Sequence, residues 1–246
     1  MTAPDSSNIK NIKIVLIGDC GVGKSSISLR YTSNEFVDNY ISTGGAAYST
    51  KLIQKYGDNL QLDIWDTAGQ ERYRSLGRTF YKDAFIVILV YDITRKDSFD
   101  NLKNIWIEEL NKNGEEKPIL AIVGNKIDQY EEEATVNEED ARKFAESNNA
   151  VFQQVSAKTG SNIEILFNLL IDEYYKNNFP DKIREERERR KSKKIVAGNH
   201  KDEKNGKKKK RKFCWYINTK VLYIMKLIAY YYDNIIIFYY FYFHNI

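Results

Sequence analysis

Residues 18–25 read Gly18-Asp19-Cys20-Gly21-Val22-Gly23-Lys24-Ser25, directly after the apolar run IVLI and directly before a stretch with helical periodicity. This order matches the phosphate-binding pattern GxxxxGK[ST] between a strand and a helix. The glycines let the backbone wrap with its N–H groups pointing inward, and the helix N-terminus favours a bound anion. The pattern therefore predicts a phosphate loop in which Lys24 reaches the β and γ phosphates and Ser25 ligates Mg²⁺. The alternative is an ordinary glycine-rich turn, which the presence of every fixed position of the pattern disfavours.

Apolar runs and helical periods alternate around this loop. We expect strands at 12–17, 48–54, 60–65, 85–91, 119–124 and 151–155, and helices at about 25–33, 97–112, 138–148 and 162–177. Runs such as FIVILVY are apolar at successive positions, as strands buried on both faces require. The predicted fold class is α/β, a P-loop domain with a six-stranded, mostly parallel sheet flanked by helices. The runs at 48–54 and 60–65 are close enough in the chain to form a hairpin.

Composition excludes several classes of site. The chain has 246 residues, of which 42% are hydrophobic and 29% charged, enough for one domain with a core plus an extension. Its two histidines, His200 and His244, lie in the last fifth of the chain, so residues 1–199 hold neither a His-based triad nor a His-ligated metal. Cys20 and Cys214 lack CxxC spacing, which argues against a disulfide scaffold and suits a reducing compartment. We interpret Cys20 as a small spacer in the loop, with a reactive thiol as the alternative.

Charge is distributed unevenly along the chain. Residues 1–180 carry 20 Lys and Arg against 27 Asp and Glu, whereas residues 181–246 carry 18 against 7. An acidic body with a basic tail predicts that the tail meets an anionic surface. The first residues show no basic segment followed by an apolar run, so we expect no signal peptide.

Two later stretches indicate which base is bound. Asn125-Lys126-Ile127-Asp128 follows one predicted strand, and Ser156-Ala157-Lys158 follows the last. Ligands of open α/β sheets bind at the carboxyl ends of strands. The Asp128 carboxylate can accept hydrogen bonds from guanine N1–H and the 2-amino group together, a donor pair that adenine lacks, and a backbone N–H of the second stretch can bind guanine O6. The sequence therefore predicts GTP and GDP, rather than ATP, as the ligands.

From about residue 12 to residue 177, two thirds of its length, the chain resembles Ras-superfamily small GTPases, specifically the Rab family. The resemblance is carried by IWDTAGQE at 64–71, RYRSL at 72–76 and VYDIT at 90–94, and GGAAY at 44–48 is similar to the endosomal branch. It implies a G domain that binds GTP, GDP and Mg²⁺ and hydrolyses GTP as a switch in membrane trafficking. The nucleotide-binding residues that it implies are Gly18, Asp19, Cys20, Gly21, Val22, Gly23, Lys24, Ser25, Ser26, Phe36, Tyr40, Thr43, Asp66, Gly69, Asn125, Lys126, Asp128, Ser156, Ala157 and Lys158.

The resemblance also implies individual roles. Ser25 and Thr43 ligate Mg²⁺, and Asp66 holds the same ion through a water. The backbone N–H of Gly69 contacts the γ-phosphate, so loss of that phosphate relaxes the segments around 36–48 and 67–77. Phe36 lies against the guanine-ribose edge, and the Lys126 stem lies over the base.

Gln70 is the residue that the resemblance assigns to orienting the attacking water, with Lys24 and Thr43 as the other catalytic residues. The segments around 36–48 and 67–77 are called the switch loops below. Neither has an arginine obviously placed to reach the phosphates from within the chain, as an arginine finger does. We therefore expect a slow intrinsic rate, on the order of 10⁻⁴–10⁻³ s⁻¹, and an activating protein that supplies the missing charge. The other implied partners are a guanine-nucleotide exchange factor, a GDP-dissociation inhibitor or escort, and effectors on the switch loops. Gly44 replaces the Ile that commonly follows the Mg²⁺-binding Thr, which alters the effector surface.

The tail is predicted to be basic and flexible. We divide the chain into an N-terminal extension (1–10), the G domain (11–180), a variable basic linker (181–214) and an apolar extension (215–246). The block KKKKRK, Lys207 to Lys212, is expected to bind an anionic membrane, and Cys214 after it is the lipidation candidate. The extension is interpreted as an artefact of the gene model, because it is dominated by Tyr, Ile, Phe, Asn and Lys, which AT-rich codons encode. A membrane-spanning helix is the alternative, which is disfavoured because Lys226 and Asp233 break the apolar runs.

Several functions remain open at this point. The leading hypothesis is a GTP-hydrolysing switch on the cytoplasmic face of an intracellular, endosomal membrane, cycling with the cytosol. A soluble or nuclear GTPase, with KKKKRK as a transport address, and a GTP-binding scaffold without hydrolysis are the alternatives. Nucleic acid is not expected as a partner, because the basic block lacks interleaved aromatic residues on a folded surface.

Overall fold

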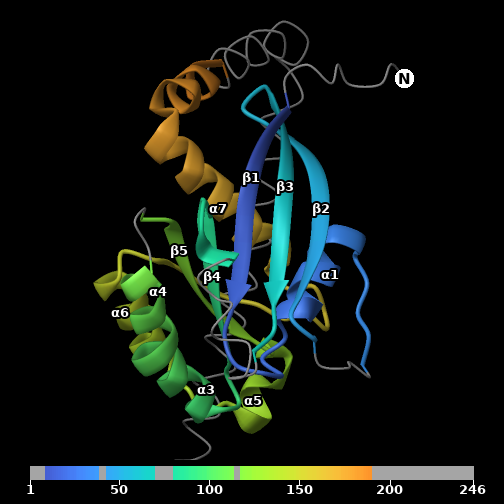
Figure 1. Ribbon diagram of the computed structural model, residues 1–246, viewed down its shortest axis with the longest axis vertical. Helices are drawn as coiled ribbons and strands as arrows, with labels where there is room; N and C mark the ends of the chain where they lie inside the picture. Colours follow the sequence, from blue (N-terminus) through green and yellow to red (C-terminus); the bar gives the residue numbers. More distant parts are fainter. Residues whose placement is uncertain (1–8, 39–42, 70–79, 114–116, 190–246) are drawn as a thin grey trace, which may run out of the picture. The chain divides into compact units, whose positions relative to one another are not determined.

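The computed structural model describes residues 9–38, 43–69, 80–113 and 117–189 (Figure 1). Six strands form one sheet in the order β2-β3-β1-β4-β5-β6. The strands are β1 (Ile9–Ile17), β2 (Ala46–Lys55), β3 (Asp58–Thr67), β4 (Ile86–Asp92), β5 (Ile119–Asn125) and β6 (Val151–Gln154). Strand β2 is antiparallel to β3, and all other neighbours are parallel. The predicted six-stranded, mostly parallel sheet is confirmed.

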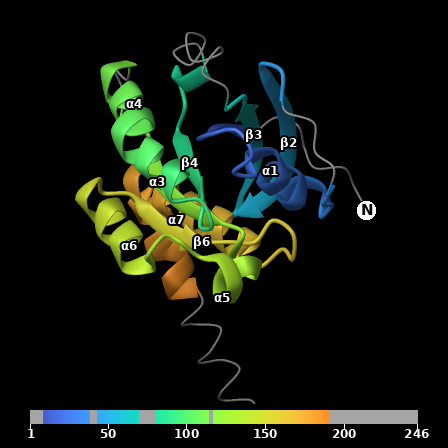
Figure 2. The same cartoon turned by 90° about the horizontal axis from the view of Figure 1, so that it is seen from below.

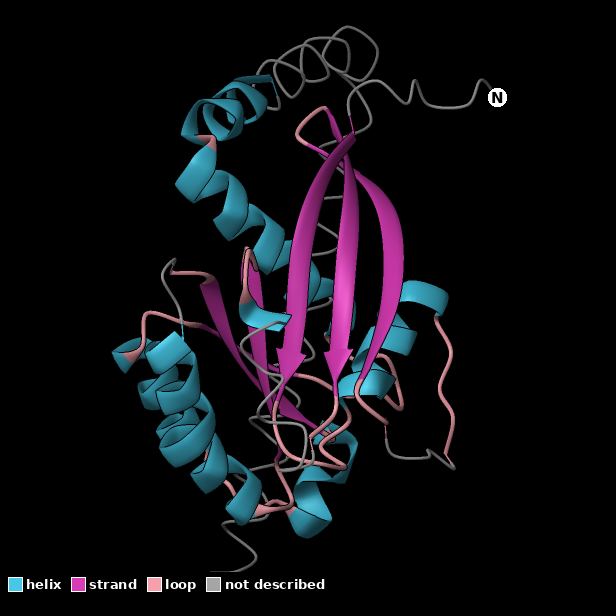
Figure 3. Cartoon of the chain, in the orientation of Figure 1, coloured by secondary structure: helices cyan, strands magenta, loops and turns pink. Residues whose placement is uncertain are grey.

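Helices cover both faces of the sheet (Figures 1 and 3). On one face, α1 (Lys24–Ser33) and α7 (Ile163–Asn178) pack against β1, β3, β4 and β5 in one buried cluster. On the other face lie α3 (Lys96–Asn101), the π-helical turn η3 (Leu102–Trp106), α4 (Ile107–Asn113) and α6 (Glu138–Ser147). Figure 2 shows this second group together on one side. Every residue of β4 is buried, which explains its uninterrupted apolar sequence.

The region predicted as one helix at 97–112 is helical but divided by the π-turn. Asn101 and Trp106 both donate to the Asp19 side chain, at 2.7 and 2.8 Å. Residues five apart lie on different faces of a regular α-helix, and the wider π-turn brings them onto the same face. The irregular turn therefore lets one helix bind the phosphate loop through two side chains.

The predicted hairpin is formed by β2 and β3. Its turn residues, Tyr56 and Gly57, have φ values of 50° and 80°. Positive φ at both central residues is what a type I′ hairpin turn requires. The β2–β3 hairpin matters for the site because Thr43 precedes one of its strands and Asp66 lies at the end of the other.

The sequence predicts that the domain ends at Pro180, but the chain continues into a helix over 180–189 and the compact body extends to Glu185. Lys182 binds Asp58 at the base of β3, and Ile183 packs against the core cluster. These two contacts hold the start of the linker on the body. Cys214 and the block from Lys207 to Lys212 lie outside the described residues. Among the residues that are described, no helix combines the length and hydropathy needed to cross a bilayer.

Asp58 is expected to stabilise this junction through its charge. Its carboxylate accepts hydrogen bonds from Lys10, Tyr175 and Lys182, and its side chain is only 11% exposed. Burial alone would raise the pKa of Asp58, but these hydrogen bonds outweigh burial and hold that pKa well below its usual range. The stabilisation is therefore complete above the unfolded pKa, about 3.9, and is lost as pH falls below that value toward the folded pKa.

We expect Asp58→Asn to lower the melting temperature at pH 7 by about 2–4 °C, the effect of roughly 1 kcal/mol in a domain of this size. Thermal unfolding should show this difference at pH 7 and a smaller one below about pH 4, where the Asp58 carboxylate of the unfolded chain begins to protonate while that of the folded protein stays charged. Asp181→Asn is the control, because Asp181 lies in an exposed pair with Arg184, and exposed pairs contribute little to stability. Equal melting temperatures for the two variants would contradict the assigned role of Asp58.

Candidate nucleotide-binding site

The predicted site segments meet at one edge of the sheet. Because β1, β3, β4, β5 and β6 are parallel, the residues that follow their carboxyl ends lie along the same edge. Figure 1 shows the arrowheads of β1 and β3 at this edge, with α1 beside them and α5 (Tyr130–Glu133) further below. The phosphate loop after β1, the segment after β3 and the two base-recognition stretches are thus brought together by the topology.

Lys24 is held inside the phosphate loop. Its ammonium donates to the carbonyls of Gly18 and Asp19, both at 2.8 Å, and its side chain is buried. Burial lowers the pKa of Lys24 to about 8, with Arg95 adding repulsion and the charge of Asp66 opposing it. A desolvated ammonium beside inward-facing backbone N–H groups is suited to bind phosphate oxygens.

Three oxygen-bearing side chains converge beside the loop. Ser25 Oγ donates to Asp66 Oδ2 and lies 3.1 Å from Thr43 Oγ1. Thr43 Oγ1 also donates to Asp66 Oδ2, at 3.3 Å. Asp66 is buried, and its Oδ1 has no hydrogen-bond partner among the described residues. Burial raises the pKa of Asp66, while the Ser25 hydrogen bond and the Lys24 charge oppose that rise. Oxygen ligands of this kind fit Mg²⁺, with phosphate oxygens and water completing its shell.

No group of three or more His, Cys, Asp or Glu side chains able to hold a metal occurs in the described part of the chain. The three converging side chains are a different kind of ligand set, one carboxylate and two hydroxyls. The structure thus brings the three predicted Mg²⁺ residues together.

The segment after β3 packs directly on the phosphate loop. A Cβ on Gly69 would lie 2.4 Å from the backbone of both Asp19 and Cys20, so only glycine fits this approach. Its neighbour Gln70 and the predicted contact Tyr40 lie outside the described residues. Phe36 is partly buried against the core cluster, and its contact with the nucleotide stays a prediction.

Hydrogen bonds join the base-recognition stretches to each other and to the phosphate loop. Buried Asn125 donates to Val22 O at 2.9 Å and accepts from the Ala157 N–H at 3.1 Å. Ser156 Oγ donates to Asp128 Oδ1 at 2.6 Å, which leaves the second carboxylate oxygen for a ligand. Gly23, at φ 96°, is required here because a Cβ would lie 2.2 Å from the Asn125 amide.

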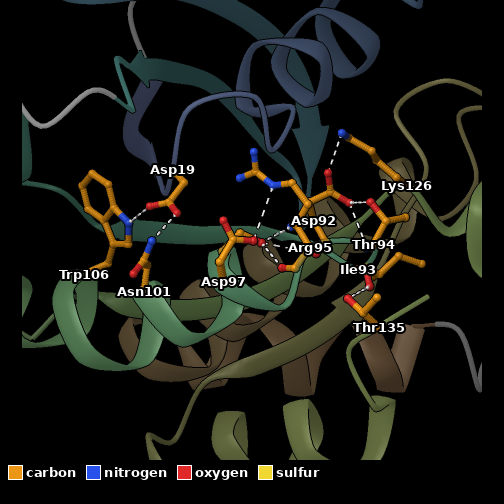
Figure 4. Close-up of polar contacts among 11 residues, drawn as sticks. Asp19, Asp92, Ile93, Thr94, Arg95, Asp97, Asn101, Trp106, Lys126 and Thr135 are labelled. Atoms are coloured by element: carbon orange, nitrogen blue, oxygen red, sulfur yellow. Dashed lines mark hydrogen bonds and ion pairs between the residues drawn. The ribbon is translucent and has the colours of Figure 1, made fainter. Parts of the chain in front are cut away.

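Several residues of the site were not found from the sequence. Arg30 Nε donates to Ala157 O at 2.8 Å and so holds the Ser156–Lys158 stretch against α1. Asp92 forms an ion pair with Lys126 at 2.5 Å, and Asn101 and Trp106 donate hydrogen bonds to Asp19 (Figure 4). The two partners of each contact are far apart in the chain, and Arg30, Asn101 and Trp106 belong to no motif, so no local signal could identify these contacts.

Comparison with known proteins identifies the family. A model of the Ras family matches residues 13–179. The chain belongs to the Ras family. It is 42% identical over 165 residues to the Ras-related protein RHN1 of Nicotiana plumbaginifolia, covering 67% of this chain and 82% of that protein. It is 41% identical over 167 residues to the Ras-related protein Rab5A of Oryza sativa subsp. japonica, covering 68% and 81%. It is 40% identical over 187 residues to the GTP-binding protein ypt5 of Schizosaccharomyces pombe, covering 76% and 87%.

These relatives confirm the Rab resemblance, and the Rab5 relatives agree with its endosomal branch. As a Ras-family GTPase of the Rab group, the chain binds GTP and GDP and hydrolyses GTP to GDP. Exchange factors, activating proteins and effectors are the general partners of this family, and Mg²⁺ is its typical ion.

Proposed function

We propose that this GTPase recruits effectors to an intracellular membrane of the endosomal system while GTP is bound. The observation that supports this most directly is the convergence of Thr43 and Asp66 on Ser25. Thr43 lies just before β2 and Asp66 lies near the end of β3, so each belongs to a different switch segment at the open end of the β2–β3 hairpin. Ser25, Thr43 and Asp66 would hold a Mg²⁺ ion at that point, and the ion would neutralise phosphate charge beside both segments. Loss of the phosphate releases both, which is an order–disorder switch.

The exposed surface between the two switch segments fits effector binding. Strand β2 is an edge of the sheet and carries Tyr48 and Leu52, which are 53% and 61% exposed. The Tyr48 and Trp65 rings lie 5.1 Å apart, and Phe80 continues the row 6.2 Å from Trp65. Exposed aromatic side chains are enriched in protein interfaces. Gly44 stands at the edge of this surface where the family commonly has Ile, so the set of effectors that bind this surface is proposed to differ.

In the proposed mechanism the protein positions groups rather than supplying a strong base. Lys24 and the loop N–H groups bind the β and γ phosphates, and Gln70 orients the attacking water. Ser25, Thr43 and Asp66 would hold Mg²⁺, which neutralises phosphate charge when bound. No arginine lies in the described parts of the two switch segments, 36–38, 43–48 and 67–69. Arg72 and Arg74 follow Gln70 outside the described residues and are interpreted as facing partners, so the proposal is that an activating protein supplies the arginine and that intrinsic turnover is slow.

Nucleotide choice tests the proposal. The wild-type protein with Mg²⁺ should bind GTP and GDP at least about 100-fold more tightly than ATP, a difference of about 2.7 kcal/mol. Chelating Mg²⁺ with EDTA should speed release of fluorescent GDP, because the ion shields the phosphates from Asp66. Fluorescence titration measures the nucleotide affinities, and stopped-flow fluorescence measures the rate of GDP release. Binding of ATP within about tenfold of GTP would overturn the guanine assignment.

Membrane attachment is proposed to depend on a prenyl group on Cys214 together with the block from Lys207 to Lys212. One lipid chain binds membranes only marginally, and basic residues near an anionic leaflet add about 1 kcal/mol each. The lipid requires the mature chain to end close to Cys214. Mass spectrometry of the C-terminal peptide of the endogenous protein should find a prenylated Cys214. Recovery of peptides from 215–246 with unmodified Cys214 would contradict the anchor.

A further inference from the structure

Arg95 lies beside the phosphate loop although no motif assigns it to the site. It is the residue before α3, and both its backbone N–H and its carbonyl are hydrogen-bonded. Its N–H donates to Asp92 O at 3.0 Å, and its carbonyl accepts from the Ser98 hydroxyl at 2.7 Å and from the Ser98 N–H at 3.1 Å. Asp92 Oδ1 in turn accepts from the Thr94 N–H at 2.9 Å and the Thr94 hydroxyl at 2.8 Å. The Arg95 side chain therefore starts from a rigid turn.

The helix that carries Arg95 is also fixed to the phosphate loop. Asp19, in the loop, accepts from Asn101 and Trp106 at 2.7 and 2.8 Å (Figure 4). These two bonds hold the α3–η3 helix against the loop independently of Arg95. The distance between the backbone of the Arg95 turn and the loop is thus set by residues other than Arg95.

The guanidinium lies over the loop at Gly21. A Cβ on Gly21 would be 3.8 Å from Arg95 Nη1, so no side chain separates the cation from the loop backbone. Figure 4 shows the side chain extending from the α3 turn toward that loop. Arg95 Nε is buried and has no hydrogen-bond partner within the described ranges. The Asp97 carboxylate is 3.9 Å from Nε, too far for a hydrogen bond, and its side chain is 72% exposed.

We propose that Arg95 is a further cation of the phosphate site, which retains the bound nucleotide by its attraction for the phosphate groups. This inference rests on the nucleotide site proposed above. A guanidinium held near a desolvated anion keeps its charge under all physiological conditions, and its attraction acts over several ångströms. Arg95 is therefore a positioning residue for the nucleotide, and it acts in addition to Lys24 and the loop N–H groups.

The test is the rate at which fluorescent GDP leaves the full-length protein in the presence of Mg²⁺ and excess unlabelled GDP. Arg95→Gln, which removes the charge but keeps much of the bulk, should accelerate release about tenfold at about 0.1 M salt. Arg95→Lys should stay within about threefold of the wild type, because it keeps the charge. Arg184→Gln is the matched control, since Arg184 follows α7, away from the phosphate loop, and forms an exposed pair with Asp181. It should leave release unchanged.

Salt dependence separates an electrostatic role from a structural one. At about 1 M salt the Debye length is about 3 Å, so the difference between the wild type and Arg95→Gln should shrink. Equal release from the wild type and Arg95→Gln at low salt would overturn the inference while leaving GDP binding intact. An equal acceleration in Arg95→Lys, or one that persists at high salt, would also overturn it and indicate a packing role. Failure of the wild type to bind GDP would instead contradict the proposed site itself.

Discussion

Asp128→Asn is expected to lower the affinity for GTP by about 100-fold and to create affinity for xanthine nucleotides. The carboxylate would otherwise accept from guanine N1–H and the 2-amino group through charge-assisted hydrogen bonds. In the variant, the amide oxygen can still accept from Ser156, which donates to Asp128 Oδ1 at 2.6 Å. The NH₂ group then faces the base, where it repels the guanine donors and can bind the 2-carbonyl of xanthine.

Competition binding with GTP and xanthosine triphosphate measures this change in preference. Ser156→Ala is the matched control. It removes the hydrogen bond that orients Asp128 and should weaken GTP binding by less than about tenfold, with no gain for xanthine. If Asp128→Asn bound GTP within about threefold of the wild type, Asp128 would not be the residue that reads guanine.

Gln70→Leu is expected to lower GTP hydrolysis stimulated by an activating protein by about 1,000-fold while GTP binding stays unchanged. Gln70 follows Gly69, whose backbone packs on the phosphate loop, and it is placed by sequence to orient the attacking water. Leucine has similar bulk but neither donates nor accepts a hydrogen bond. Stimulated phosphoryl transfer depends on this positioning, and stimulation itself is worth 10³–10⁵-fold in related GTPases.

Single-turnover hydrolysis with an activating protein that stimulates the wild type gives the measurement. Gln54→Leu provides the same substitution away from the site, because Gln54 lies on β2 and donates to Asn59. It should hydrolyse GTP at the wild-type rate. Unchanged stimulated hydrolysis in Gln70→Leu would remove Gln70 from the mechanism.

The sheet could be predicted from sequence, and candidate ligand residues could be named, because the sequence signals for both are local. Strand β4 is buried at every position, so its apolar run appears directly in the sequence. The phosphate loop, the Asn125–Asp128 stretch and the Ser156–Lys158 stretch each need fixed residue types at fixed spacing, because each binds its ligand mainly through its own short segment. The parallel order of strands then brings these segments to one edge.

Only the tertiary structure decided how these segments are supported. Asp19 occupies a variable position of the loop pattern, and its partners Asn101 and Trp106 are 82 and 87 residues away. Arg95 precedes an ordinary helix, and Asp58 joins Lys182 across 124 residues. Such contacts depend on how distant elements approach one another, and the local sequence around these side chains carries no spacing that pairs them. The sequence of this protein therefore determined its fold and the nucleotide chemistry, whereas the packing of α3 on the phosphate loop and of the linker on the hairpin followed from the folded chain alone.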